Sequence, residues 1–403
     1  MKLLGVGKRY SGYKSWSFFE ADKDYKSYKL VREINRVPSR IIPLSKVEEE
    51  RVDEIIEKNI IISLHDHSLV YPEKPDEFIE YMRIGRPWIG YEGLAYSGLD
   101  GFFEGMFDGV ALMRSPDPWD WDNVVHQIGM FQADIDHQDL VFVARRSEDF
   151  EKAFREGRIA MVIHLEGPPN IREDLSKVDI LYGLGVRCMG IAYSRGNEFG
   201  SGLADKIDRG LTDLGYELVR RMNKLGILID LAHAGDKTSL DVIEASKDPV
   251  VITHAGARSL WPSRRMKPDE VIQALAERGG VFGVEAAPHT TITINNPRHS
   301  IDSVMEHFQY IEKLVGIDHV AFGPDTLFGD HVALHRVFGE YLAISATEEN
   351  LPQFPRVDYV DGLENPSEFR NIIRWLVKNG YSDQEIAKII GGNILRVTRR
   401  VWR

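Results

Sequence analysis

From residue 45 onward, short apolar runs alternate with segments whose apolar residues recur at helical spacing. Most of the short runs are apolar at nearly every position, which is typical of parallel strands covered by helices on both faces. Nine runs are predicted to be strands: IIISL (60–64), GMFDGVALM (105–113), LVFV (140–143), AMVI (160–163), VRCMGIAY (186–193), ILIDL (227–231), VVIT (250–253), VFGV (281–284) and HVAF (319–322). Strands that alternate with helices predict either a (β/α)8 barrel or an open doubly wound sheet.

Predicted helices separate these runs and also close the chain. Ser45 with Glu48, and Ser382 with Glu385, have the spacing of a capping box at a helix start. The predicted helices are 45–59, 117–135, 147–157, 212–226, 237–247, 267–280, 302–316, 365–380 and 382–390. We favour the α/β class and the (β/α)8 TIM barrel, for which nine strands are one too many. LVFV is short and lies between two helices, so we interpret it as the extra strand.

Three stretches do not follow this alternation. Residues 1–44 are rich in Tyr, Ser and Lys, and we interpret them as a small N-terminal β appendage to a barrel domain of residues 45–403. Residues 71–105 and 326–360 are long, aromatic-rich connections. Loops of that length in a compact domain are usually lids or binding loops, so we expect both to face the substrate.

Composition and charge restrict the classes of partner. The 403 residues carry a formal net charge of -12, and acidic and basic residues are interspersed, which argues against a nucleic-acid or membrane-surface partner. No apolar run approaches the roughly 18 residues of a membrane span, and the apolar run in the opening MKLLGVGKRY, which ends at Lys8, is too short for a signal peptide. The single cysteine, Cys188, excludes an intramolecular disulfide and suits a reducing compartment. We therefore expect a cytoplasmic protein.

Metal-capable side chains stand at the ends of five predicted strands. The first strand ends on His65-Asp66-His67, and residues two apart in a strand point to the same side. AMVI leads to Glu166, ILIDL to His233, VVIT to His254, and HVAF to Asp325. In a barrel the carboxyl ends of all strands open on one face, where active sites lie. Imidazoles and carboxylates gathered there match the ligands that zinc and similar divalent ions prefer.

Each of these residues also has an ordinary interpretation. A lone histidine after a strand is usually a hydrogen-bonded structural residue, Glu166 could cap a helix, and Asp325 could be a turn residue. Coincidence at five strand ends is much less frequent than any one of these. His164 lies one residue early in its strand and is set aside. The chain has no G-x-x-x-x-G-K-[ST], H-E-x-x-H, C-x-x-C or G-x-S-x-G motif, and Cys188 is interpreted as a core residue.

The order His-x-His, Glu-Gly, His, His and Asp resembles the amidohydrolase superfamily of metal-dependent (β/α)8 barrels. Within that superfamily, the local sequence is similar to the membrane (renal) dipeptidase family. The resemblance is dense over about residues 120–325 and resumes in the C-terminal helices. The similar segments are FREGRIAMVIHLEG, LYGLGVRCMGIAY, GLTDLGYELVRRMNKLGILIDLAHAG, PVVITHAGARSLWPSRRMKPDEVIQALAERGGVFGV and GLENPSEFRNI with GGNILRV.

The resemblance implies a centre of two divalent metal ions, which we expect to be zinc. His65 and His67 would hold one ion, His233 and His254 the other, and Glu166 would bridge them. A water shared by the ions would attack the amide, with Asp325 as the base and then as the proton donor to the leaving amine. Arg265 would bind the substrate's terminal carboxylate, with Arg264 beside it as the alternative.

The chain departs from the family pattern at two positions. His67 stands where the family commonly has an aspartate, and Tyr193 stands where the family has a histidine that polarises the scissile carbonyl. A phenol can also donate to a developing oxyanion, so Tyr193 is predicted to be catalytic and substrate-binding; ordinary aromatic packing is the alternative.

Our hypothesis is a zinc-dependent hydrolase of small amide bonds, and a dipeptidase is the best single assignment. The alternatives are hydrolysis of N-acyl amino acids, lactones or cyclic amides, or a metal-dependent decarboxylase. The expected partner is a small-molecule substrate, a dipeptide or related amide, and a homodimer is the assembly considered.

Overall fold

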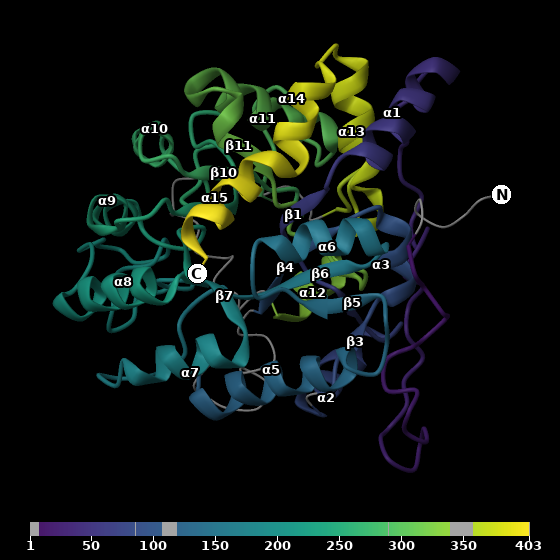
Figure 1. The fold of residues 1–403 in the computed structure, drawn as a ribbon, viewed down its shortest axis with the longest axis horizontal. Helices are drawn as coiled ribbons and strands as arrows, with labels where there is room; N and C mark the ends of the chain where they lie inside the picture. The colour runs from purple at the N-terminus through teal and green to yellow at the C-terminus, as the bar shows by residue number, and fades with distance from the viewer. Residues whose placement is uncertain (1–7, 85, 107–118, 289, 339–357, 403) are drawn as a thin grey trace.

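The structure is a computed structural model that describes residues 8–84, 86–106, 119–288, 290–338 and 358–402. A parallel sheet of nine strands forms its centre, and eight of the strands follow one another in a single path around a nearly closed barrel (Figure 1). In path order these strands are β1 (Ile62–Asp66), β4 (Gly101–Met106), β6 (Ile159–Leu165), β7 (Val186–Gly190), β8 (Leu228–Asp230), β9 (Val251–Ala255), β10 (Val281–Val284) and β11 (Val320–Phe322). The predicted (β/α)8 architecture is confirmed.

The barrel closes between its first and last strands. After β11 the backbone N–H of Asp325 donates to the carbonyl of His65 over 2.9 Å, and the N–H of His67 donates to the carbonyl of Thr326 over 2.8 Å. These hydrogen bonds lie at the carboxyl end of β1, so closure brings two of the predicted metal-binding segments side by side.

The extra strand is the one expected. β5 (Val141–Val143) pairs with the first half of β6, along Ile159–Met161, whereas β7 pairs with the second half, from Ile163 to Leu165. Since β4 occupies the other edge of β6, β5 and β7 share a single edge, and β5 does not belong to the path.

Helices surround the strands, as Figure 1 shows for α5 to α11. Both predicted capping boxes are present, Ser45 with Glu48 at α1 and Ser382 with Glu385 at α14. No helix in the described part of the chain is long and apolar enough to cross a membrane. The helices are α1 (Lys46–Lys58), α2 (Phe78–Ile84), α3 (Tyr91–Ser97), α5 (Trp121–Ile135), α6 (Glu148–Glu156), α7 (Ser176–Leu184), α8 (Asp213–Leu225), α9 (Asp236–Ala245), α10 (Asp269–Glu277), α11 (Ile301–Val315), α12 (His331–Phe338), α13 (Arg370–Lys378), α14 (Asp383–Ala387) and α15 (Asn393–Val401).

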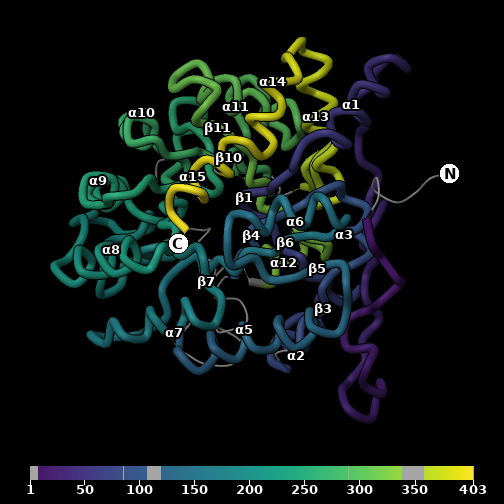
Figure 2. Tube along the Cα trace, in the orientation of Figure 1, coloured from purple at the N-terminus to yellow at the C-terminus, as the bar shows by residue number. Residues whose placement is uncertain are grey.

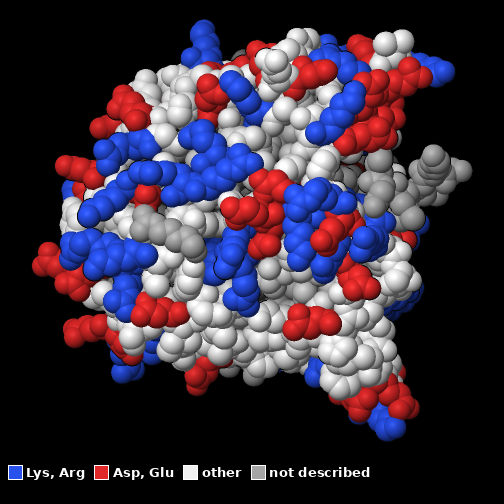
Figure 3. Space-filling model, in the orientation of Figure 1, with Lys and Arg blue, Asp and Glu red and all other residues white. Residues whose placement is uncertain are grey.

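Buried apolar residues form two main layers. Alternate strand residues such as Leu64, Phe103 and Val162 form an inner core that includes Trp402 at the C-terminal end of the chain. Their neighbours along the strands form an outer core with the helices. A π-helical turn (Lys388–Gly392) leads into α15, and both pack against the strands, so that the yellow C-terminal helix lies over the barrel in Figure 2. Lys and Arg side chains are interspersed with Asp and Glu over the face shown in Figure 3.

The N-terminal stretch differs from the expected β appendage. Residues 8–44 contain turns and isolated bridges but no strand, and Trp16 and Asp22 break the extended backbone with positive φ angles. This segment packs on the barrel: Trp16 is 1% exposed, and the backbone N–H of Trp16 donates to the Asp134 carboxylate of α5 over 2.9 Å. Residues 1–7 lie outside the described residues.

The prediction for residues 71–113 is wrong in its boundaries. The stretch 71–105, expected to be a connection, contains a 3-10 turn (Pro75–Glu77), α2, β3 (Trp88–Ile89, paired with β2, Leu69–Val70), α3 and most of β4. The strand predicted at 105–113 begins four residues earlier, at Gly101. Residues 107–118 lie outside the described residues, as do 339–357 of the predicted connection 326–360. The helices α7, α12 and α15 were not predicted.

Candidate metal centre

Strand alternation carries Glu166 into the barrel. In β6 the side chains of Ala160 and Val162 belong to the inner core, and the odd-numbered residues on either side of them, such as Met161 and Ile163, belong to the outer core. Continuing this period of two places His164 and Glu166 on the inner side, one above the other toward the mouth. Both are buried, with 0% and 3% exposure.

Two strands contain an extra residue where a metal-capable histidine stands. Between Ser63 and Asp66 the strand β1 advances three residues while β4 advances two, and between Ile252 and Ala255 the strand β9 gains one residue on β10. Leu64 belongs to the inner core, so an unbroken alternation would turn His65 outward. A one-residue bulge moves the following side chains to the other face of the strand. The bulges therefore bring His65 and His254 into the mouth of the barrel.

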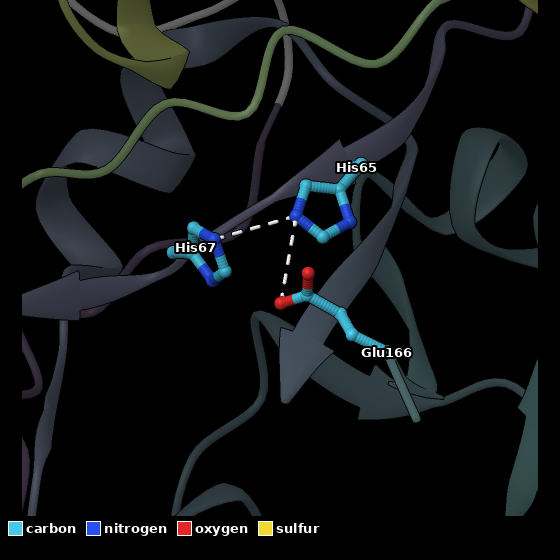
Figure 4. Close-up of side chains that lie close together, drawn as sticks. All are labelled: His65, His67 and Glu166. Carbon is cyan, nitrogen blue, oxygen red and sulfur yellow. Dashed lines mark hydrogen bonds and ion pairs between the residues drawn. The ribbon is translucent and has the colours of Figure 1, made fainter. Parts of the chain in front are cut away.

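The six predicted ligands converge there. Glu166 lies between the two pairs of histidines: its Oε2 is 3.0 Å from His233 Nε2 and 3.6 Å from His254 Nε2. Its Oε1 is 3.9 Å from His65 Nε2, on the side of the first pair, which Figure 4 shows with Glu166. The Nε2 atoms of His65 and His67 are 3.3 Å apart, and those of His233 and His254 are 3.1 Å apart. Ligand atoms lie within 4.8 Å of one another in three groups, His65–His67–Glu166, Glu166–His233–His254 and His65–His254–Asp325.

Each of the four histidines points its Nε2 atom to the centre and its Nδ1 atom to a partner. The partner of His67 is a carbonyl, Gly105 O at 2.8 Å, which only accepts, so Nδ1 carries a proton. The other partners are Ser194 Oγ for His233 at 3.1 Å, Thr253 Oγ1 for His254 at 2.8 Å, and His164 Nδ1 for His65 at 3.4 Å. Such outer hydrogen bonds orient metal-binding imidazoles.

Asp325 and Ser194 both have left-handed backbone at the centre, with φ of 56° and 57°. Non-glycine residues with such angles cluster at functional sites, where the surroundings hold them in place. The Asp325 carboxylate lies 3.1 Å from His67 Nε2 and 3.4 Å from His65 Nε2. Burial alone would raise the pKa of Asp325, but its contacts with these two histidines hold that pKa well below its usual range.

Burial sets the protonation of the imidazoles. It lowers the pKa of His65 to about 3 and the pKa values of His233 and His254 well below the usual range, so these rings are neutral and have a lone pair for a metal ion. Burial also disfavours charge on His67, but the hydrogen bond and charge of Asp325 outweigh it and raise the pKa of His67 to about 9. A metal ion at Nε2 of His67 would replace that proton.

The residues present fit a divalent metal centre. Imidazole nitrogen and carboxylate oxygen are the ligand set of zinc in hydrolases. Glu166 Oε1 is fully buried and has no hydrogen-bond partner in the described part of the chain, and burial raises the pKa of Glu166 well above its usual range. A buried carboxylate oxygen without a donor costs stability unless a cation compensates it.

The two predicted substrate-facing residues also lie at the mouth. The ring of Tyr193 packs on the imidazole of His233, with centroids 4.3 Å apart. Arg265 is near the centre, where Nη1 donates to the carbonyl of His254 over 3.1 Å, but Nη2 lies 2.5 Å from the carboxylate of Glu285. Arg264, the alternative, donates from Nη1 to the carbonyl of Asp205.

Glu285 was not predicted from the sequence. It directly follows β10, is 0% exposed, and burial raises its pKa to about 7 although the nearby Arg265 opposes the change. Its position at a strand end was a usable signal, the same one that identified Glu166. The structure thus places the buried carboxylate of Glu285 beside Arg265, the residue that was expected to bind the carboxylate of the substrate.

Three further polar residues behind the ligands were missed: His164, Asp230 and Thr253. His164 was set aside as pointing away, but its spacing of two from Glu166 puts both side chains on the same side of β6. Asp230 is the last residue of β8 and 1% exposed, and Thr253 immediately precedes His254. For Thr253 the sequence contains no comparable signal.

Comparisons with known proteins agree with this geometry. The chain is 26% identical over 279 residues to dipeptidase tcpJ of Claviceps purpurea (strain 20.1), which covers 68% of this chain and 59% of the relative. It is 30% identical over 276 residues to dipeptidase verJ of Clonostachys rogersoniana, which covers 66% of this chain and 63% of the relative. The matches therefore span about three fifths of the length of these curated relatives.

A solved structure of a related enzyme has a similar fold. An amidohydrolase from Pseudomonas aeruginosa superposes with a TM-score of 0.71 at 26% identity, over 87% of this chain and 99% of that one. The family model described as membrane dipeptidase (peptidase family M19) matches residues 114–335 and 353–403, which include Glu166, His233, His254 and Asp325. Since this match covers well over half of the sequence and contains most of the candidate ligands, the chain belongs to the membrane dipeptidase family, peptidase family M19.

Proposed function

We propose that this protein is a metal-dependent dipeptidase with two divalent ions, zinc in the simplest case, at the mouth of its barrel. The observation that carries the proposal is the convergence of four buried Nε2 atoms on Glu166, with Asp325 beside them. The two curated relatives named above are dipeptidases, and their names support the choice of a peptide amide as the substrate.

Each residue has a role that follows from its position. His65 and His67 would hold one ion, His233 and His254 the other, and Glu166 would contact both. Ions in this place would polarise the substrate carbonyl and lower the pKa of a water molecule. Asp325, ionised and exposed on 16% of its side chain, would accept a proton from the attacking water and pass it to the leaving amine.

Two residues would bind the substrate. The hydroxyl of Tyr193, whose ring packs on His233, would donate a hydrogen bond to the developing oxyanion. Arg265 would face the terminal carboxylate. Its contact with Glu285 partly cancels its charge, and this observation favours substrates with an uncharged group there, such as cyclic amides or lactones, as the second candidate class.

The test is a substrate panel assayed with purified protein that has been stripped of metal and reloaded with zinc. L-L and L-D dipeptides, dipeptide amides, N-acyl amino acids and lactones would be compared by liquid chromatography. We expect dipeptides to be cleaved. Turnover of lactones or cyclic amides with intact dipeptides would favour the second class, and carbon dioxide release would indicate a decarboxylase.

A matched pair of variants tests the centre itself. Glu166→Gln should reduce turnover by at least about 100-fold, because it removes the charge shared by the two ions. Glu217→Gln, at a carboxylate of α8 with a 56% exposed side chain, is the control and should be unaffected. Elemental analysis of the unmodified protein should find two divalent ions per chain, and retained activity of Glu166→Gln would refute the shared role.

We also propose a cytoplasmic location, supported by the single cysteine, Cys188, which is buried in the inner core. Export of the protein by its native host would contradict this. The homodimer considered from the sequence remains a proposal, and sedimentation equilibrium would decide it.

A further inference from the structure

The carboxylate of Asp230 accepts four hydrogen bonds behind the metal-binding histidines. Its Oδ1 accepts from the backbone N–H of Thr253 over 2.8 Å and from that of Ala232 over 3.2 Å. Its Oδ2 accepts from Thr253 Oγ1 over 2.9 Å and contacts His164 Nε2 at 3.2 Å. Asp230 is 1% exposed, so these protein groups take the place of water around its charge.

Each partner of Oδ2 contacts a different metal-binding histidine. Thr253 Oγ1 lies 2.8 Å from His254 Nδ1, and His164 Nδ1 lies 3.4 Å from His65 Nδ1. His254 belongs to the ligand group with Glu166 and His233, whereas His65 belongs to the group with His67 and Glu166. Two chains of hydrogen bonds thus leave one carboxylate and reach the two halves of the centre.

The donors and acceptors in the chain from Asp230 through Thr253 to His254 follow from the protons that each group has to donate. An ionised carboxylate only accepts, so the hydroxyl of Thr253 donates its single proton to Asp230. The Thr253 oxygen then accepts from His254, which requires the proton of that ring to sit on Nδ1. The Nε2 atom of His254 therefore has a free lone pair directed to the centre.

The second chain gives the same result for His65. His164 Nε2 faces the carboxylate of Asp230, which only accepts, so that the opposite ring nitrogen, Nδ1, is the atom placed to accept the Nδ1 proton of His65. The lone pair of His65 is then at Nε2, which faces Glu166 and Asp325. Both chains select the tautomer that binds a metal ion.

We propose that Asp230 is a positioning residue for both halves of the centre, acting on His254 through Thr253 and on His65 through His164. This inference rests on the proposed function in that it takes these histidines as metal ligands. The remaining two are held independently, His67 by the carbonyl of Gly105 and His233 by Ser194. They provide internal controls.

The two chains of hydrogen bonds can be tested by measuring metal binding, without any substrate. Metal-free full-length protein would be titrated with zinc in competition with a chromogenic chelator, and with cobalt while the visible spectrum is recorded. Thr253→Val keeps the size of the side chain but removes the hydroxyl, and it should weaken one of the two binding steps by about 10- to 100-fold. His164→Phe should weaken the other step by a similar factor.

Asp230→Asn should weaken both binding steps, because it affects both chains of hydrogen bonds. It should also change the visible spectrum of cobalt bound in each step. Thr253→Ser, which restores the hydroxyl, should bind both ions normally, and this rescue separates orientation from a loss of packing. If Asp230→Asn does not fold, the Thr253 and His164 variants still test the two chains of hydrogen bonds separately.

The proposal is overturned if Asp230→Asn binds both ions with unchanged constants, or if Thr253→Val and His164→Phe weaken the same step. It is also overturned if Thr253→Ser behaves like Thr253→Val. Absence of divalent-ion binding by the unmodified protein would instead refute the proposed function, and with it the premise of this inference.

Discussion

A buried lysine next to the centre makes a pH-dependent contribution to stability that can be measured. Lys267 lies in the connection between β9 and α10, is 0% exposed, and donates from Nζ to the carbonyl of Ala234 over 2.7 Å. It forms no ion pair with a carboxylate among the residues described. Burial lowers its pKa from 10.5 to about 7, although Asp236 nearby opposes the change.

The sign and size of the effect follow from this pKa. Below pH 7 the ammonium is charged in both the folded and the unfolded chain, so the full cost of burying it is present. Between pH 7 and 10.5 only the unfolded chain holds the proton, so the free energy of unfolding rises with pH by about 1.4 kcal/mol per pH unit. Over the whole interval the pKa of Lys267 corresponds to about 5 kcal/mol.

The perturbation is Lys267→Met, which keeps the apolar stem and removes the charge. The variant also loses the hydrogen bond to Ala234, which is worth about 1 kcal/mol. We therefore expect it to be more stable than the unmodified protein at pH 7, by about 4 kcal/mol at most. The difference should shrink steadily as pH rises toward 10.

Urea unfolding of metal-free protein, followed by far-UV circular dichroism between pH 6 and 10, measures this difference. Subtracting the two curves removes the titration of all groups that both proteins share. Lys46→Met, at a lysine whose side chain is 90% exposed on α1, is the matched control and should give a difference independent of pH. A flat difference for Lys267→Met would refute the argument from burial.

Three further predictions concern the centre. Glu285→Gln should lower the KM for dipeptides by roughly tenfold and leave dipeptide amides unchanged, because it removes the negative charge beside Arg265; equal changes for both substrates in steady-state kinetics would contradict this. Gly105→Ala should abolish binding of at least one ion in the chelator titration, since a Cβ there would overlap the first histidine of β1 and lie 2.7 Å from His67 Cε1. The control is Gly129→Ala in the middle of α5, where the added Cβ would have no atom within 4 Å. This variant should stabilise the protein by about 1 kcal/mol. Removal of metal should lower the melting temperature in differential scanning fluorimetry and added zinc should restore it, because the buried carboxylates lose their counter-charge; an unchanged temperature would argue against a resident ion.

The barrel was predictable because its strands are distinct apolar runs between helices with clear ends. The same signal failed where apolar residues continue for too long. Residues 101–113 are mostly apolar, and the prediction started the strand at Gly105, whereas β4 begins at Gly101. Helix α7 was missed because its apolar residues do not form a single face, and helices of this kind are recognised mainly through their packing.

The ligands were predictable because their strands end in them, but their orientation was not. The spacing of His65 and His67 predicted that both rings point to the same side, and their Nε2 atoms do lie 3.3 Å apart, yet the spacing did not reveal which face of the barrel they occupy. That face depends on the bulge between Ser63 and Asp66, which is a property of the pairing with β4. Pairing between strands that are distant in sequence leaves no mark in either strand alone. The same reason explains why Asp230 was missed, since its partners belong to β6 and β9.

The bulges also explain why glycines line the mouth of the barrel. Turning an imidazole inward from β1 requires space on the neighbouring strand, and a Cβ at Gly105 of β4 would collide with His65 and with His67, which follows β1. On the other side, Gly323 follows β11, and a Cβ there would approach the backbone of His65 and collide with the carbonyl of Thr253. The rings of His65 and His67 are thus accommodated by the absence of a side chain at Gly105 on the adjacent strand. A centre of this kind therefore needs two matched features, a bulge on one strand and a glycine on the next, and a substitution of either glycine should damage the centre while the outer core remains intact.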